Sequence, residues 1–166
     1  MRPDLSPLIR LSEYRVPDFL IDHVDLDFRL VPDATRVKAL LHLRRNPAGR
    51  ADAPLALDGE DLTLLSVALD NTPLAEDAYE VSPEKLRINR VPDGPFRLAI
   101  ETRINPAGNT RLMGLYRSNG VYCTQCEADA FRRITYFLDR PDVMSTYRVR
   151  MEAEKAEAPL LLSNGN

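Results

Sequence analysis

The residues best suited to chemistry lie together in Cys123-Thr-Gln-Cys-Glu127. Two thiols at this spacing are typical of a zinc ligand pair or of a redox pair. Gln125 and Glu127 stand two positions apart and add an amide oxygen and a carboxylate. On an extended segment both of these side chains would point to the same side. Two such acceptors would bind a cation with several N–H donors, for example a primary ammonium, through charge-assisted hydrogen bonds.

A metal or redox role for the thiols has little support in the rest of the chain. A structural zinc site needs further ligands, but there is no second CxxC, and His23 and His42 lie far upstream. A cross-strand Cys2His2 site stays open as an alternative. A thioredoxin-type pair would begin a helix in a βαβ unit, which the sequence before Cys123 does not suggest. We expect both cysteines to be half-buried filler and assign no metal to the chain.

The segment that follows allows a second interpretation of the carboxylate. A short helix is expected from about Glu127 to Phe131, and Glu127 could simply favour its positive end. Arg140-Pro141 blocks any helical continuation. We interpret the neighbouring charged side chains as structural and the neighbouring aromatic ones as core; they are Arg132, Asp139 and Arg140, and Tyr136 and Phe137, respectively.

The elements that must position these residues are strands. Apolar residues alternate with polar ones at period two, which puts one side of each strand on a core and the other in water. The alternating apolar residues are Val24, Leu26, Phe28 and Leu30; Val37, Ala39, Leu41 and Leu43; Phe96, Leu98, Ile100 and Ile104; and Tyr147, Val149 and Met151. His23 and His42 fall on the polar, solvated sides. Asp25 and Asp27 share a face, but without a glycine-centred loop they are weak evidence for calcium.

Turn signals separate the strands, and they set the fold class. Turn-forming sequences stand at Asn46–Gly49, Asp58–Gly59, Asp70–Asn71, Pro92–Gly94 and Asn105–Gly108. Short strands divided by such turns predict a mainly β protein, an antiparallel β-sandwich or large curved sheet with one short helix. The 13 prolines agree, because proline suits turns and strand ends.

Composition excludes several classes of protein. The net charge is −3 and there is no basic stripe, so a nucleic-acid partner is disfavoured. No apolar run is long enough to cross a membrane, and the first residues lack the apolar region of a secretory signal. A disulfide between two cysteines this close would close only a very short loop and would not stabilise a domain. A reducing, cytoplasmic location is therefore expected.

The two ends of the chain differ from its middle. Residues 1–13 are expected to form a loose arm, and residues 14–166 the β-domain. Leu160–Leu162 has the pattern of a buried strand, and Ser163-Asn-Gly165 that of the turn after it. No returning strand follows this turn, so we expect the sequence to be cut from a longer protein.

One long segment carries a family resemblance. Ile104–Val143, which includes CTQCEADAFRRITYFLDRPD, closely resembles the N-terminal domain of the bacterial aminopeptidase N enzymes. These enzymes are alanyl aminopeptidases of the gluzincin zinc metallopeptidases. Shorter matches are Tyr14–Asp18, Ala53–Asp61 and Leu161–Asn166. The likeness therefore runs from about Tyr14 to the end of the chain.

The resemblance implies a saddle-shaped β-rich domain that leans on a thermolysin-like catalytic domain. It also implies that Gln125 and Glu127 bind the free α-amino group of a peptide substrate. The family's zinc motif HExxH and its Gly-x-Met-Glu-Asn motif are both missing from this sequence. Zinc would therefore belong to the catalytic domain of the longer enzyme, and this chain should not hydrolyse peptides alone.

Two other classes of function stay open at this point. One is a self-contained β-sandwich interaction module with no link to peptidases. The other is a small metal-binding domain built on the CxxC, which stoichiometric zinc in the purified chain would support.

Overall fold

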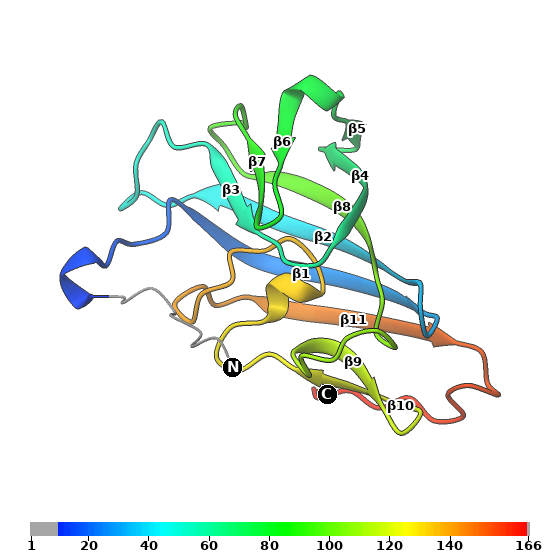
Figure 1. Ribbon diagram of the computed structural model, residues 1–166. Helices are drawn as coiled ribbons and strands as arrows, with labels where there is room; N and C mark the ends of the chain where they lie inside the picture. Colours follow the sequence, from blue (N-terminus) through cyan, green and yellow to red (C-terminus); the bar gives the residue numbers. More distant parts are fainter. Residues whose placement is uncertain (1–9, 166) are drawn as a thin grey trace.

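The computed structural model describes residues 10–165, which form three β-sheets (Figure 1). The large sheet has the strand order β11-β1-β2-β8-β4-β5, with bounds Thr146–Ala153, Phe19–Leu30, Thr35–Arg45, Phe96–Ile104, Thr63–Leu69 and Thr72–Pro73. A smaller sheet has the order β3-β7-β6, with bounds Leu55–Asp58, Lys85–Ile88 and Tyr79–Val81. A hairpin is formed by β9 (Gly114–Ser118) and β10 (Val121–Gln125). The prediction of a mainly β fold built on a curved open sheet is confirmed.

The alternation of apolar and polar residues determines which face of the large sheet is buried. Val24 on β1 lies opposite Leu41 on β2, and both side chains are fully buried. A bulge between Ile21 and His23 shifts the register, so Phe19 and Ile21 also face the core. The predicted inward residues of β1, β2 and β8 are all buried.

The smaller sheet and the segment after β10 complete the core. Leu57 on β3 and Leu86 on β7 are fully buried in the same apolar cluster as the inner face of the large sheet. Residues 131–138 cover the rest of the cluster, and Tyr136 and Phe137 are buried there, as predicted. Thr102 is also buried, and its Oγ1 donates a hydrogen bond to the carbonyl of Ile134 at 3.1 Å. This bond ties β8 to the covering segment.

One strand pair departs from the antiparallel pattern expected from the sequence. β11 runs parallel to β1, from His23 opposite Thr146 to Leu30 opposite Ala153. A parallel pair needs a long connection, which most of the chain here supplies. β11 is also an edge strand, so the side it turns toward the core is only partly covered. Tyr147 and Val149 remain 48% and 40% exposed.

Helical structure is limited to three short 3-10 turns within residues 10–165: η1 (Leu11–Glu13), η2 (Glu76–Ala78) and η3 (Phe131–Arg133). The predicted helix from Glu127 to Phe131 is wrong, because helical backbone begins only at Phe131. Residues 1–9 of the predicted arm lie outside the described part, and Leu11 is 90% exposed. Among the described residues there is no helix of the length and apolar character that a membrane span requires.

The prediction of a buried strand at Leu160–Leu162 is also wrong. This segment has no strand structure, and Leu160 and Leu162 are 71% and 80% exposed. Only Leu161 packs partly against the core. An apolar run becomes a buried strand only where a neighbouring strand pairs with it, and within residues 10–165 no strand pairs with this segment.

A glycine next to the covering segment provides a test of the packing. A Cβ on Gly59 would meet the ring of the buried Tyr136, whereas a Cβ on Gly94 would meet no atom within 4 Å. We expect Gly59→Ala to lower the free energy of unfolding by about 1–3 kcal/mol, because the core must shift to admit the methyl group.

Urea denaturation of the two alanine variants measures this effect. The matched control Gly94→Ala should change the free energy of unfolding by less than about 0.5 kcal/mol. Equal effects of the two substitutions would show that Tyr136 is not packed against Gly59.

Candidate functional site

The predicted acceptor pair lies where the β9–β10 hairpin ends. Gln125 is the last residue of β10 and lies opposite Gly114, the first residue of β9. Gly114 has a φ of +73°, and a Cβ there would lie 2.7 Å from the Cβ of Arg133. Glycine at this position therefore allows the hairpin to approach η3. Figure 1 shows the hairpin at one end of the molecule, with the chain running from it into η3.

Gln125 and Glu127 are both exposed to solvent. The prediction that both side chains lie on one side of an extended strand is wrong, because β10 ends at Gln125 and residues 127–129 form a bend. The two residues are instead joined by a long hydrogen bond, in which Gln125 Nε2 donates to the carbonyl of Glu127 at 3.4 Å. The bond engages the amide nitrogen of Gln125, and its acceptor oxygen remains available.

The carboxylate of Glu127 is available as well. Within residues 10–165 it has no hydrogen-bond or ion-pair partner. Glu127 also lies outside η3, whose first residue is Phe131, so the alternative role at a helix start is wrong. The peptide bond between Glu127 and Ala128 is cis. The exposed side chains of the loop thus include one carboxylate without a partner in the described residues and one free amide oxygen.

The charged residues after the loop are structural, as predicted. Arg132 Nε donates to Asp139 Oδ2 at 2.6 Å, and Arg132 Nη2 to Asp129 Oδ2 at 2.6 Å. The side chain of Asp139 is only 8% exposed, and its backbone N–H donates to Asp58 Oδ2 on β3. These bonds fix the segment after Glu127 against the smaller sheet.

A second arginine in this segment was missed from the sequence. The Arg133 side chain is buried and forms ion pairs with Glu60 and with Asp61, the latter at 2.6 Å. Its partners lie more than 70 positions earlier in the chain. The sequence offered only two signals for these ion pairs: the acidic residues in Asp58-Gly-Glu-Asp61 and the basic pair Arg132-Arg133. Neither signal specified which residues would meet.

Arg140 fixes the far end of the same segment to the start of the described chain. Its guanidinium donates to both oxygens of Asp142 at 2.6 Å and to the carbonyl of Arg15 at 2.8 Å. The hydroxyl of Tyr14 donates to Asp142 Oδ2 at 2.9 Å. The bonds from Arg140, together with that from Tyr14, hold the pKa of Asp142 below its usual value.

The cysteines do not have the properties of a redox pair. Cys123 and Cys126 are free and half-buried. Burial, together with the negative charge of Asp139, raises the pKa of the Cys126 thiol to about 11. A redox thiol needs the opposite shift, since the thiolate is the reactive form. The structure therefore supports the interpretation of Cys126 as half-buried filler.

The histidines lie together, but on the outward face of the large sheet. His23 and His42 are opposite each other on β1 and β2, and their Nε2 atoms lie 3.5 Å and 3.6 Å from the two oxygens of Asp25. Asp27 is paired with Arg150 at 2.8 Å. Asp25 and Asp27, which were weak evidence for calcium in the sequence, therefore each have a basic neighbour. No group of three or more metal-ligating side chains suited to an ion occurs in the described part of the chain.

Comparison with known proteins places these features in a family. A model of the peptidase M1 N-terminal domain matches residues 21–166. The chain is 50% identical over 166 residues to aminopeptidase N of Caulobacter vibrioides, and the matched region is 100% of this chain and 19% of that protein. It is 46% identical over 154 residues to aminopeptidase N of Escherichia coli, and the matched region is 93% of this chain and 17% of that protein.

A solved structure agrees with the sequence comparison. The crystal structure of Legionella pneumophila aminopeptidase A in complex with aspartic acid matches with a TM-score of 0.85 at 34% identity, and covers 95% of this chain and 18% of that one. The chain thus spans about a fifth of the length of these relatives.

The raised pKa of Cys126 predicts slow reaction with alkylating agents. In a Cys123→Ser variant, the rate of iodoacetamide modification should rise about tenfold per pH unit between pH 7 and pH 10. The reason is that the thiolate fraction grows tenfold per unit at any pH below the pKa of about 11.

The same variant unfolded in urea serves as the control. Its rate should level off above the ordinary thiol pKa of about 8.5. A plateau near that pH in the folded protein would contradict the burial of Cys126.

Proposed function

The chain belongs to the peptidase M1 N-terminal domain family, and from this premise we propose that it works as the non-catalytic N-terminal domain of a zinc-dependent aminopeptidase. In this role it contributes the anchor for the free α-amino group of a peptide substrate. The observation that carries the proposal is the exposed Glu127 carboxylate, which has no partner within residues 10–165 and lies next to Gln125.

The chemistry of the anchor follows from the two acceptors. A peptide's ammonium group has three N–H donors, and the Glu127 carboxylate would accept from them with opposite charge. The amide oxygen of Gln125 would accept a further N–H, since the amide nitrogen is already bonded to the Glu127 carbonyl. The ion pairs of Arg132 fix the segment that begins at this loop, which keeps the rearrangement on binding small.

Such an anchor would make the enzyme act on the first residue of a peptide. Zinc held by a catalytic domain would supply Lewis-acid chemistry, polarising the scissile carbonyl and activating water. This chain offers no ligand set for the metal in its described residues, so the catalytic domain would supply it. An internal stretch of peptide has no ammonium to pair with Glu127. It would leave a desolvated carboxylate unpaired, at a cost of several kcal/mol.

Exposed apolar side chains support an association with the catalytic domain. Met144 is 84% exposed and Val121 is 61% exposed, and Tyr147 on the edge strand β11 is 48% exposed. Large apolar side chains exposed on a domain can mark where another domain covers it. The two free cysteines are those expected of a reducing compartment, so we place the enzyme in the cytoplasm. No observation specifically favours a self-contained interaction module.

The amine anchor is tested with Glu127→Gln in the longer enzyme. We expect kcat/KM for unblocked peptide substrates to fall by about 100-fold or more, because the uncharged amide no longer pairs with the ammonium. The measurement is steady-state hydrolysis of an aminoacyl fluorogenic substrate, with circular dichroism to confirm the fold.

Glu76→Gln is the matched control, because Glu76 is an exposed glutamate on η2. It should leave kcat/KM unchanged. A loss of less than about threefold for Glu127→Gln would show that Glu127 is not the anchor.

A further inference from the structure

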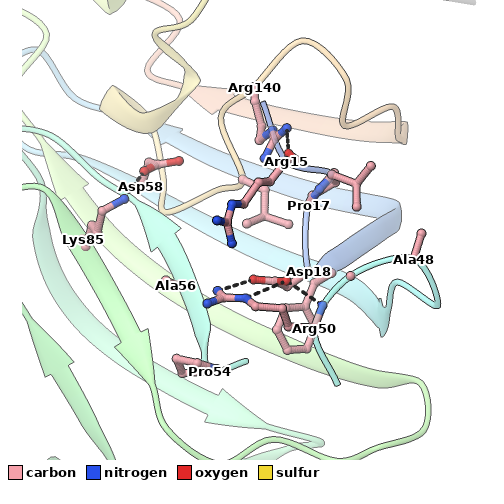
Figure 2. Close-up of a pocket in the computed structure, with 14 residues that line it drawn as sticks. Arg15, Pro17, Asp18, Ala48, Arg50, Pro54, Ala56, Asp58, Lys85 and Arg140 are labelled. Carbon is pink, nitrogen blue, oxygen red and sulfur yellow. Dashed lines mark hydrogen bonds and ion pairs between the residues drawn. The ribbon is translucent and has the colours of Figure 1, made fainter. Parts of the chain in front are cut away.

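A cavity of about 760 Å³ has a lining that includes neither Gln125 nor Glu127 (Figure 2). Its walls come from the segment before β1, the starts of β1 and β7, the loop between β2 and β3, strand β3, and the loop after η3. The volume is within the range of sites for small organic ligands. The amine anchor uses none of the side chains that line it.

The lining is basic in a protein that is acidic as a whole. Four basic side chains reach the cavity, namely Arg15, Arg50, Lys85 and Arg140, against only two acidic ones, Asp18 and Asp58. The whole chain has a net charge of −3. A cavity with excess positive charge inside low-dielectric walls attracts anions.

Both acidic side chains are already paired with cations. Asp18 Oδ2 accepts from Arg50 Nη2 at 2.7 Å, and Asp18 Oδ1 accepts from the Arg50 backbone N–H at 2.8 Å. Asp58 Oδ1 accepts from Lys85 Nζ at 2.7 Å. The hydrogen bonds from Arg50 are the main cause of the lowered pKa of Asp18, to which the charge of Arg15 adds a smaller part. Both carboxylates of the lining are therefore already engaged by cations of the protein itself.

The guanidinium of Arg15 is the available cation. It makes no hydrogen bond or ion pair with any residue between 10 and 165, whereas the guanidinium of Arg140 is occupied by Asp142 and by the carbonyl of Arg15. That bond to the Arg15 carbonyl also fixes its backbone. Figure 2 shows the Arg15 side chain extending between the Asp58–Lys85 pair and the Asp18–Arg50 pair.

The remaining walls are apolar. Val16, Pro17, Phe19, Ala56 and Leu138 contribute to the lining. A guanidinium presents a planar fork of donors that matches a carboxylate, and the apolar walls would cover a hydrocarbon group beside it. Inorganic anions would use the charge but leave these walls in contact with water.

We propose that this cavity binds a small organic carboxylate that carries an apolar group, with the carboxylate paired to Arg15 and the apolar group against Val16 and Ala56. A free apolar amino acid and the C-terminal residue of a peptide share this chemistry. Neither the cavity nor its ligand depends on the amine anchor.

The test is a titration of the 15N-labelled 166-residue chain at low ionic strength, in which the amide chemical shifts are measured by NMR. The probe is N-acetyl-leucine, which has the carboxylate and the apolar group but no ammonium that could bind Glu127. We expect saturable shifts of residues that line the cavity. Arg15→Gln should weaken the affinity at least about tenfold, because a charge-assisted hydrogen-bond pair is lost. The affinity of the Arg15→Lys chain should lie between those of the unsubstituted and Arg15→Gln chains, because lysine keeps the positive charge but lacks the planar fork of donors.

Arg29→Gln is the matched control, since Arg29 is an exposed arginine on β1 outside the cavity. It should bind N-acetyl-leucine as the unsubstituted chain does. Tighter binding of free leucine or of N-acetyl-Ala-Ala-Leu would identify which of the two sources the cavity prefers.

Four outcomes would overturn the proposal. They are an absence of saturable shifts at the cavity, equal affinity of the Arg15→Gln and unsubstituted chains, equal shifts with leucinamide, which lacks the carboxylate, and tighter binding of inorganic phosphate than of N-acetyl-leucine. None of them affects the amine anchor, which is tested separately through Glu127.

Discussion

The ion pair between Arg132 and Asp139 is the interaction on which the candidate site depends. One oxygen of Asp139 accepts both the backbone N–H and the side-chain Nε of Arg132, and the backbone N–H of Asp139 donates to Asp58. These bonds close the segment on itself and attach it to β3. Removing Arg132 would leave the carboxylate of Asp139, which is only 8% exposed, without its cation. The loop that carries Glu127 leads directly into this fixed segment.

The fold could be predicted from the sequence where the signal is local. The period-two pattern of Val24–Leu30 and of Val37–Leu43 identified two central strands, because every second side chain enters one core. The partner of β11 could not be predicted in this way. A parallel pair between distant segments leaves no turn or spacing in the sequence. The apolar run at Leu160–Leu162 failed for a related reason, since burial depends on a partner that local composition does not reveal.

For the candidate site, the sequence indicated residue types but not the backbone geometry. The residue types of Gln125 and Glu127 suggested a cation-binding pair, and the family resemblance suggested the role in binding an amino group; both stay predictions. The assumption of extended backbone was wrong, because the strand ends at Gln125 and the chain bends after it. The pairing of Arg133 with Glu60 and Asp61 was not predictable, because charged residues are common and their partners lie far apart in the chain.

The parallel pairing of β1 with β11 also affects how the protein is made. His23 lies opposite Thr146, so β1 acquires its neighbour on that side only after more than a hundred further residues have been translated. Contacts between such distant residues form slowly, because a long loop must close first. Throughout this interval the backbone of β1 presents unpaired hydrogen-bonding groups along that edge, to which other nascent chains or a chaperone would bind.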